Sequence, residues 1–212
     1  MPIQAKICGL STPETVDAAI RGGASHIGLN FFPPSPRHVD FERARALAAR
    51  IPSHVRRVGV FVDPCNALLD QAIDAGALDI VQVHKAAAGR VAAIRGHAGR
   101  ETWAAIGVRT GQDLDNAEKL AGAADFILYD AAQPDDAPLP GGMGTRFDWG
   151  LLRNFRHPLP WGLAGGLTDQ NLAEAVRMTG ARLVDTSSGV ESGPGIKDVD
   201  KIAAFLKAAA NL

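Results

Sequence analysis

The sequence has few cysteines and no long run of apolar residues. Only Cys8 and Cys65 occur among the 212 residues, and their spacing fits neither a disulfide framework nor a metal site. We expect both to be reduced thiols. No apolar run approaches the roughly 20 residues that a membrane helix needs, and no basic segment followed by an apolar stretch marks a secretory signal. We therefore predict a cytoplasmic protein without a membrane partner.

The sequence also lacks an excess of charge of either sign. The formal net charge is −1, and no long run of like charges occurs. A nucleic-acid groove would need clustered basic residues, so we expect no nucleic-acid partner. The GxGxxG and GxxxxGK[ST] phosphate-binding patterns are absent as well. With 46% hydrophobic residues, the chain can bury a core without disulfides or metal staples.

Short β-rich runs alternate with alanine-rich helical runs along the chain. We predict strands at Gln4–Cys8, His26–Asn30, Arg57–Val62, Ile80–Val83, Thr102–Val108, Phe126–Tyr129, Trp161–Leu163 and Leu183–Thr186. We predict helices at Thr12–Arg21, Phe41–Arg50, Asn66–Ala75, Ala88–His97, Leu114–Ala121, Trp149–Asn154, Asp169–Thr179 and Asp198–Ala210. Strict alternation favours parallel strands, and eight units close a (βα)8 TIM barrel with a parallel eight-stranded core. A doubly wound open sheet is the alternative. We expect one domain spanning residues 1–212.

Two of the strand-to-helix connections are longer than the others. They read NFFPPSPRHVD, after the second predicted strand, and DAAQPDDAPLPGGMGTRFDW, after the sixth. In a parallel barrel, loops that follow strands lie on the C-terminal face, where active sites are built. These two insertions therefore predict where the functional site lies.

The last two units each contain a turn of small residues between a strand and a helix. The turns read LAGGL, with Gly165 and Gly166, and TSSGV, with Ser188 and Gly189. Glycine-rich turns at this position of a barrel are typical of phosphate sites, because backbone N–H groups can approach the anion. The alternative is a pair of turns that only reverse the chain.

The segment QAKICGLS places a lysine and a cysteine two residues apart at the end of the first predicted strand. The period of two along a strand puts Lys6 and Cys8 on one face. An ammonium group beside a thiol favours the thiolate. Cys8 is therefore either a base or a small buried apolar residue.

Three further residues have side chains suited to catalysis or binding. Asp130 ends the sixth strand and is either a general acid or a loop cap. Asp185, on the eighth strand, faces either the site or backbone groups at the barrel mouth. Arg37 lies among prolines, which can hold its guanidinium for a carboxylate or phosphate, although a solvated arginine is the default interpretation.

The histidines show no pattern of metal ligands. His84 lies near the mouth of the fourth strand, where packing or hydrogen bonding is the better interpretation, because no companion ligands accompany it. We interpret Lys85 as solvated. We predict no metal and no cofactor.

An ordered set of motifs resembles the phosphoribosylanthranilate isomerase family of tryptophan biosynthesis. The motifs are KICGL, GLNFFPPSPRHV, VGVFV, VQVH, GGMGTRFDW, LAGGL and VDTSSGVESGPGIKD, and they run from the first strand to the last helix. The resemblance implies a (βα)8 barrel that performs a cofactor-free Amadori rearrangement, the third step from chorismate to tryptophan. It converts the aminoaldose N-(5-phosphoribosyl)anthranilate to the aminoketose 1-(2-carboxyphenylamino)-1-deoxyribulose 5-phosphate.

The resemblance also implies roles for individual residues. Cys8 corresponds to the general base, Asp130 to the general acid, and Arg37 to the ligand of the anthranilate carboxylate. The phosphate loops correspond to Gly165, Gly166, Ser188 and Gly189. We add Lys6, which would help to ionise Cys8, and Asp185 to the substrate-binding set. The expected partner is the small phosphoribosyl substrate, and the chain is expected to be a monomer or a homodimer.

The sequence departs from the family at three places. Lys85 stands where the family usually has glycine, Met143 replaces a hydroxyl residue, and the segment DDAPLP aligns less readily. Two other functions stay open. Another phosphosugar isomerase could use the same phosphate loops, and a non-catalytic barrel could bind a phosphate ligand without turnover.

Overall fold

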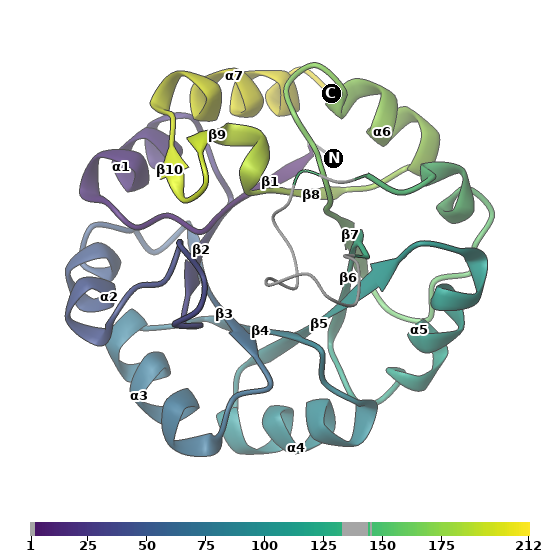
Figure 1. Cartoon of the computed structure of the whole chain (residues 1–212), viewed down its shortest axis with the longest axis horizontal. Helices are drawn as coiled ribbons and strands as arrows, with labels where there is room; N and C mark the ends of the chain where they lie inside the picture. The colour runs from purple at the N-terminus through teal and green to yellow at the C-terminus, as the bar shows by residue number, and fades with distance from the viewer. Residues whose placement is uncertain (1–2, 133–143, 145) are drawn as a thin grey trace.

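Eight parallel strands close on themselves in chain order in the computed structural model, which describes residues 3–132, 144 and 146–212 (Figure 1). The strands are β1 (Gln4–Cys8), β2 (His26–Asn30), β3 (Arg56–Val62), β4 (Ile80–His84), β5 (Glu101–Val108), β6 (Phe126–Ala131), β7 (Trp161–Leu163) and β8 (Leu183–Thr186). The pairing of β1 with β8 completes the ring. The (βα)8 prediction is confirmed, and the open sheet is excluded.

Helices form a ring around the barrel (Figure 1). They are α1 (Pro13–Arg21), α2 (Phe41–Ala48), α3 (Asn66–Gly76), α4 (Ala88–Ala98), α5 (Asp115–Lys119), α6 (Leu172–Thr179) and α7 (Val199–Ala210). Side-chain oxygens of Thr12, Asp40 and Asp198 accept hydrogen bonds from the first-turn N–H groups of α1, α2 and α7. In the described part of the chain, no helix has the length and apolar character needed to span a membrane.

The covering layer differs from the prediction between β6 and β7. The predicted helix at Trp149–Asn154 is wrong, because only a 3-10 helix forms there, at Trp149–Leu152. Glycine and asparagine are poor helix formers, and Gly150 and Asn154 occupy much of this short segment. The helix predicted at Leu114–Ala121 is shorter than expected and follows a 3-10 turn at Gly111–Leu114.

An antiparallel hairpin follows β8 and was not predicted. Its strands are β9 (Glu191–Gly193) and β10 (Ile196–Lys197), preceded by a 3-10 turn at Ser188–Val190. Figure 1 places this hairpin beside α7 and α1, next to the barrel. It lies where the eighth strand-to-helix connection should lie, so it belongs to the C-terminal face of the barrel.

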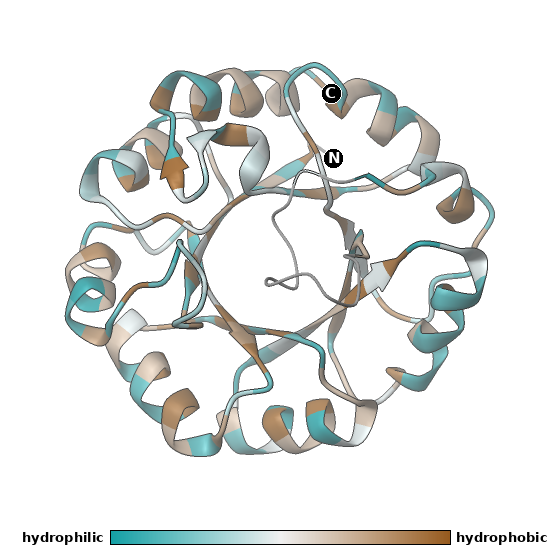
Figure 2. Ribbon diagram, in the orientation of Figure 1, coloured by the Kyte–Doolittle hydropathy of each residue, from teal (hydrophilic) through white to brown (hydrophobic). Residues whose placement is uncertain are grey.

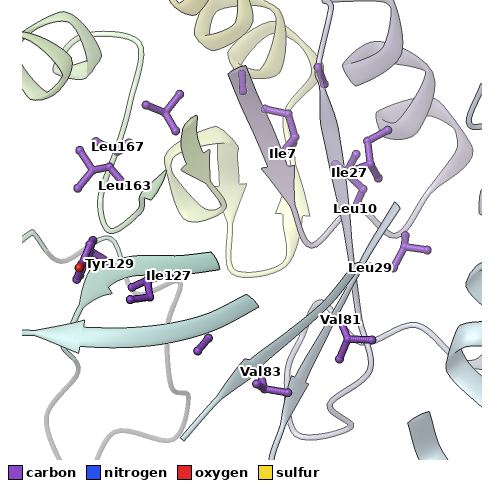
Figure 3. Packing of buried hydrophobic residues seen from close by; sticks show 14 of the residues in the cluster. Ile7, Leu10, Ile27, Leu29, Val81, Val83, Ile127, Tyr129, Leu163 and Leu167 are labelled. Carbon is purple, nitrogen blue, oxygen red and sulfur yellow. The ribbon is translucent and has the colours of Figure 1, made fainter. Parts of the chain in front are cut away.

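Side chains alternate between the two sides of the barrel wall. Outward-facing residues such as Ile7, Ile27, Val81 and Ile127 belong to a large apolar cluster shared with the helices (Figure 3). The inward-facing residues form a separate, smaller cluster made of Cys8, Val58, Val60, Ile80, Trp103, Leu128, Ala164 and Leu183. Figure 2 accordingly shows hydrophobic residues along the strands and mixed colours around the helices. The period of two thus points the alternate residues Cys8 and Asp130 into the barrel.

Candidate active site

A pocket opens at the C-terminal ends of the strands. It is lined by Cys8, Asn30, Phe32, Ser35, Arg37, Val60, Val62, Gln82, His84, Asp130, Ala164, Gly165, Gly166, Asp185, Thr186, Ser187, Ser188 and Gly189. Every residue that the sequence placed in the site therefore reaches the pocket, with the exception of Lys6. The long connection after β2 contributes Phe32, Ser35 and Arg37, as its length predicted.

Lys6 lies beneath the pocket and is completely buried. Its Nζ donates a hydrogen bond to Asp185 Oδ2 at 3.0 Å, across the ladder in which β1 pairs with β8. The predicted shared face of Lys6 and Cys8 is confirmed, because both point into the barrel. Lys6 is not among the residues that line the pocket. Its hydrogen bond to Asp185 connects it to the pocket, because Asp185 is one of the lining residues.

The protonation of Cys8, which the sequence left open, depends on two opposing effects. Burial raises the pKa of the Cys8 thiol, and the Asp185 carboxylate adds to that effect. The Lys6 ammonium lowers the pKa, as expected, but does not cancel the burial. The charges of Asp185 and Cys8 in turn outweigh the burial of Lys6 and raise its pKa, so Lys6 stays charged. The balance of these effects favours the thiol form of Cys8 beside the Lys6 ammonium group.

Asp130 faces the same pocket from β6. The strand continues to Ala131, two residues beyond its predicted end, and the Ala131 N–H donates to Asp130 Oδ1 at 2.8 Å. Burial, helped by the nearby Asp185 carboxylate, raises the pKa of Asp130 to about 7. A carboxyl group with this pKa holds a proton near neutral pH and can donate it to a substrate.

The two glycine turns approach the pocket through their backbones. Gly165 has a φ of 90°, and a Cβ there would lie 2.6 Å from Ala131 N and 3.1 Å from Asp130 Oδ1. The turn must therefore be glycine to fit beside Asp130. Asn171 holds the turn by donating to Gly166 O at 2.9 Å and accepting from Thr168 N. These bonds explain why α6 begins at Leu172, later than predicted.

Arg37 is buried, with 5% of its surface exposed, so the default interpretation of a solvated arginine is wrong. Its Nε and Nη2 donate to the two oxygens of Glu191 at 2.7 and 2.8 Å. Lys197 forms an ion pair with the same carboxylate at 2.8 Å. The sequence interpretation missed Glu191 and Lys197. The Gly-Pro-Gly between the two is a turn signal that could have revealed the hairpin.

His84 and Lys85 have the structural roles that the sequence predicted. His84 Nε2 lies 3.0 Å from Gln82 Nε2 in a hydrogen bond, and burial lowers the pKa of His84 to about 4. Lys85 is exposed. Its φ of 54° is a conformation that glycine adopts without strain, which suits the family's glycine at this position. Within residues 3–132, 144 and 146–212, no three His, Cys, Asp or Glu side chains gather to hold a metal ion.

Most of the second insertion, with Met143 and DDAPLP, falls outside the described residues. Gly144 is described, and a Cβ there would lie 3.7 Å from Ser188 Oγ. Gly144 therefore lies beside the turn that follows β8.

Comparison with known proteins agrees with this geometry. Residues 5–208 match the family model of N-(5'-phosphoribosyl)anthranilate (PRA) isomerase. A relative of that name from Zymomonas mobilis subsp. mobilis is 53% identical over 210 residues, covering 98% of both chains. The crystal structure of phosphoribosyl anthranilate isomerase from Thermotoga maritima superposes with a TM-score of 0.88 and 32% identity, over 99% of this chain and 100% of that one.

A further crystal structure of a phosphoribosyl anthranilate isomerase, in complex with reduced 1-(o-carboxyphenylamino)-1-deoxyribulose 5-phosphate, has a TM-score of 0.86 and 30% identity. It covers 99% of this chain and 100% of its own. Family model, relative and solved structures thus agree over essentially the whole barrel. The chain belongs to the N-(5'-phosphoribosyl)anthranilate isomerase family.

Proposed function

We propose that Asp130 and Cys8 carry the two proton transfers by which this isomerase acts on N-(5-phosphoribosyl)anthranilate. The observation behind this assignment is their placement on one pocket, from β6 and β1, with Asp130 poised to hold a proton near pH 7. An acid and a base on different strands can reach the substrate from two sides. Side chains positioned in this way typically contribute about 10²–10⁴-fold each to proton transfer.

The reaction begins with acid catalysis by Asp130. The carboxyl group donates its proton to the furanose ring oxygen, and the bond from C1 to that oxygen breaks with its electron pair on oxygen. The lone pair of the anilino nitrogen forms the C1=N bond of a protonated Schiff base. The Asp130 carboxylate that remains is stabilised by the Ala131 N–H at 2.8 Å.

The second step is removal of the C2 proton by the Cys8 thiolate. The electron pair of the C2–H bond becomes a C1=C2 double bond, and the C=N pair returns to nitrogen. The enolamine then loses the proton of its C2 hydroxyl and gains one at C1, which gives the ketone. The buried Lys6 ammonium stabilises the thiolate whenever it forms, because its charge lowers the pKa of Cys8.

The remaining residues hold the substrate at its ends and along its sugar. Arg37 suits the anthranilate carboxylate, and the turns with Gly165, Gly166, Ser188 and Gly189 suit the phosphate. Asp185 Oδ1 is buried without a partner in the described part of the chain. A buried acceptor needs a donor, so we assign Asp185 to a sugar hydroxyl. Two fixed ends leave the reacting carbons between Asp130 and Cys8.

Turnover is tested by the loss of fluorescence of phosphoribosylanthranilate made in situ. Wild type should turn over, and Asp130→Asn and Cys8→Ser should each lose about 100-fold or more, as expected when an essential acid or base is removed. Cys65→Ser is the matched control, since Cys65 is exposed and does not line the pocket. Full activity of Cys8→Ser would assign the base to another residue. Product binding without any turnover by wild type would instead indicate a non-catalytic barrel.

The chemistry of the thiol base also bears on where the enzyme works. A thiol base must stay reduced, which suits the cytoplasm. We further propose that residues 1–212 act as one domain and that the chain works as a monomer or a homodimer. Light scattering of the purified chain measures which of the two states forms.

A further inference from the structure

The Glu191 carboxylate has no capacity left for substrate. Its Oε1 accepts from Arg37 Nε at 2.7 Å and pairs with Lys197 Nζ at 2.8 Å. Its Oε2 accepts from Arg37 Nη2 at 2.8 Å and from the Gly195 N–H at 3.2 Å. Two oxygens with four donors are saturated. Glu191 therefore acts on the pocket only through the groups that it holds.

The Lys197 ammonium group likewise has no hydrogen-bond donor left for substrate. Its side chain is 1% exposed, and its Nζ donates to Ser187 O at 2.8 Å and Ser187 Oγ at 3.1 Å, besides pairing with Glu191. An ammonium group has three donors, so all of them are used within the protein. Ser187 Oγ in turn donates to Cys8 O at 3.2 Å. One chain of bonds thus runs from Arg37 through Glu191 and Lys197 to the end of β1.

The β9–β10 hairpin also packs against the loop that carries Arg37. A Cβ on Gly195, whose φ is 78°, would lie 2.7 Å from Pro36 O. A Cβ on Gly9, directly after Cys8, would lie 2.7 Å from Arg37 Cδ. Lys201 Nζ donates to Glu191 O at 2.7 Å and so ties the hairpin to α7. The Arg37 side chain is therefore fixed along its stem and at its head.

The net charge of Arg37, Glu191 and Lys197 suits the binding of the anthranilate carboxylate. Arg37 and Lys197 carry two positive charges and Glu191 one negative charge, which leaves one net positive charge at the pocket wall. A long side chain loses rotamer freedom when it binds a ligand, unless it is already held in place. Without Glu191 the two cations would repel each other, and the guanidinium would lose its fixed plane.

We infer that Glu191 is a positioning residue that presents the Arg37 guanidinium to the anthranilate carboxylate, and that Lys197 anchors this pair to the turn beside Cys8. The inference rests on the proposed role of Arg37. It makes the β9–β10 hairpin part of the substrate site, although neither Glu191 nor Lys197 lines the pocket. It predicts an effect on binding of the substrate rather than on the proton transfers.

The test is a double-mutant cycle in the fluorescence assay with wild type, Glu191→Gln, Arg37→Ala and the double variant. Losing a hydrogen-bonded charge should raise KM by about 10- to 100-fold, while kcat changes less than about threefold. Competition by anthranilate should weaken by a similar factor. In the Arg37→Ala background the Glu191→Gln change should alter KM less than about threefold, because Glu191 acts through Arg37.

Asp79→Asn is the matched control. The Asp79 carboxylate also holds an arginine, Arg57, by Nε and Nη2 at 3.0 and 3.1 Å, but it does so at the opposite end of the barrel. That variant should lower the melting temperature and leave KM unchanged. Gly195→Ala is a second variant that removes no charge, and it should raise KM by pushing the hairpin away from Pro36.

Two results would overturn the inference. One is a KM and an anthranilate inhibition within threefold of wild type in Glu191→Gln, or in Gly195→Ala if Glu191→Gln does not fold. The other is an effect of Glu191→Gln that persists undiminished without Arg37. In either case wild-type turnover and its loss in Asp130→Asn and Cys8→Ser would still stand, so the proposed function is tested separately.

Discussion

Asp130 should reduce the stability of the folded protein at the pH at which it works. Its pKa is about 7 in the folded chain against an ordinary value of 3.8, because burial and Asp185 disfavour the charged form. Between these values the folded state holds a proton that the unfolded state has lost. Stability therefore falls as the pH rises from about 4 to about 7, and the loss is complete above pH 7.

Asp130→Asn removes this loss. Its amide oxygen can still accept from the Ala131 N–H, which donates to Asp130 Oδ1 at 2.8 Å, and it carries no charge at any pH. A difference of about three pKa units corresponds to about 4 kcal/mol of unfolding free energy. The side chain is partly exposed to the pocket, so solvent screening makes this figure an upper limit. The variant should be more stable than wild type by up to about 1.5 kcal/mol at pH 5 and about 4 kcal/mol at pH 8.

Urea unfolding at pH 5 and pH 8 measures this difference through the midpoints, provided the slopes agree. Cys65→Ser serves as a control that should show no pH-dependent gain. The reasoning is refuted if Asp130→Asn gains the same stability at both pH values, or if wild type is the more stable protein at pH 8. The same variant should be inactive, so greater stability and lost turnover would come from one carboxyl group.

Three further predictions follow from the buried charges and the backbone. The kcat/KM profile of wild type should rise with pH to about 7, stay level, and fall above the raised pKa of Cys8, because the reactive form needs protonated Asp130 and thiolate Cys8 together. If the break near pH 7 persists in Asp130→Asn, the acid has been assigned wrongly. Lys6→Met should lower the free energy of unfolding in urea by about 3–5 kcal/mol, because it leaves the Asp185 carboxylate buried and unpaired. A decrease of less than about 1 kcal/mol would contradict a stabilising ion pair between Lys6 and Asp185. Lys85→Gly should raise the free energy of unfolding by about 1 kcal/mol in the same assay and leave kcat unchanged, since glycine adopts a φ of 54° without strain. A decrease in the free energy of unfolding would show that the backbone at this position is not strained.

The sequence was most informative where a pattern is local. Strands β1, β2, β7 and β8 have the predicted bounds, because alternation, glycine turns and caps are properties of neighbouring residues. The inward direction of Cys8 and Asp130 also follows from the period of two. The prediction failed at Trp149–Asn154, where the poor helix formers Gly150 and Asn154 leave only a 3-10 helix.

By itself, then, the sequence determined the alternating (βα)8 order, the face of the barrel that carries the site, and the family motifs. Only the tertiary structure decided the pairing of Lys6 with Asp185, which are 179 positions apart, and of Arg37 with Glu191, 154 apart. It also decided the proton state of Cys8 and Asp130. The physical reason is that desolvation and Coulomb interactions depend on every group that closes around a side chain, and strands distant in the sequence supply those groups.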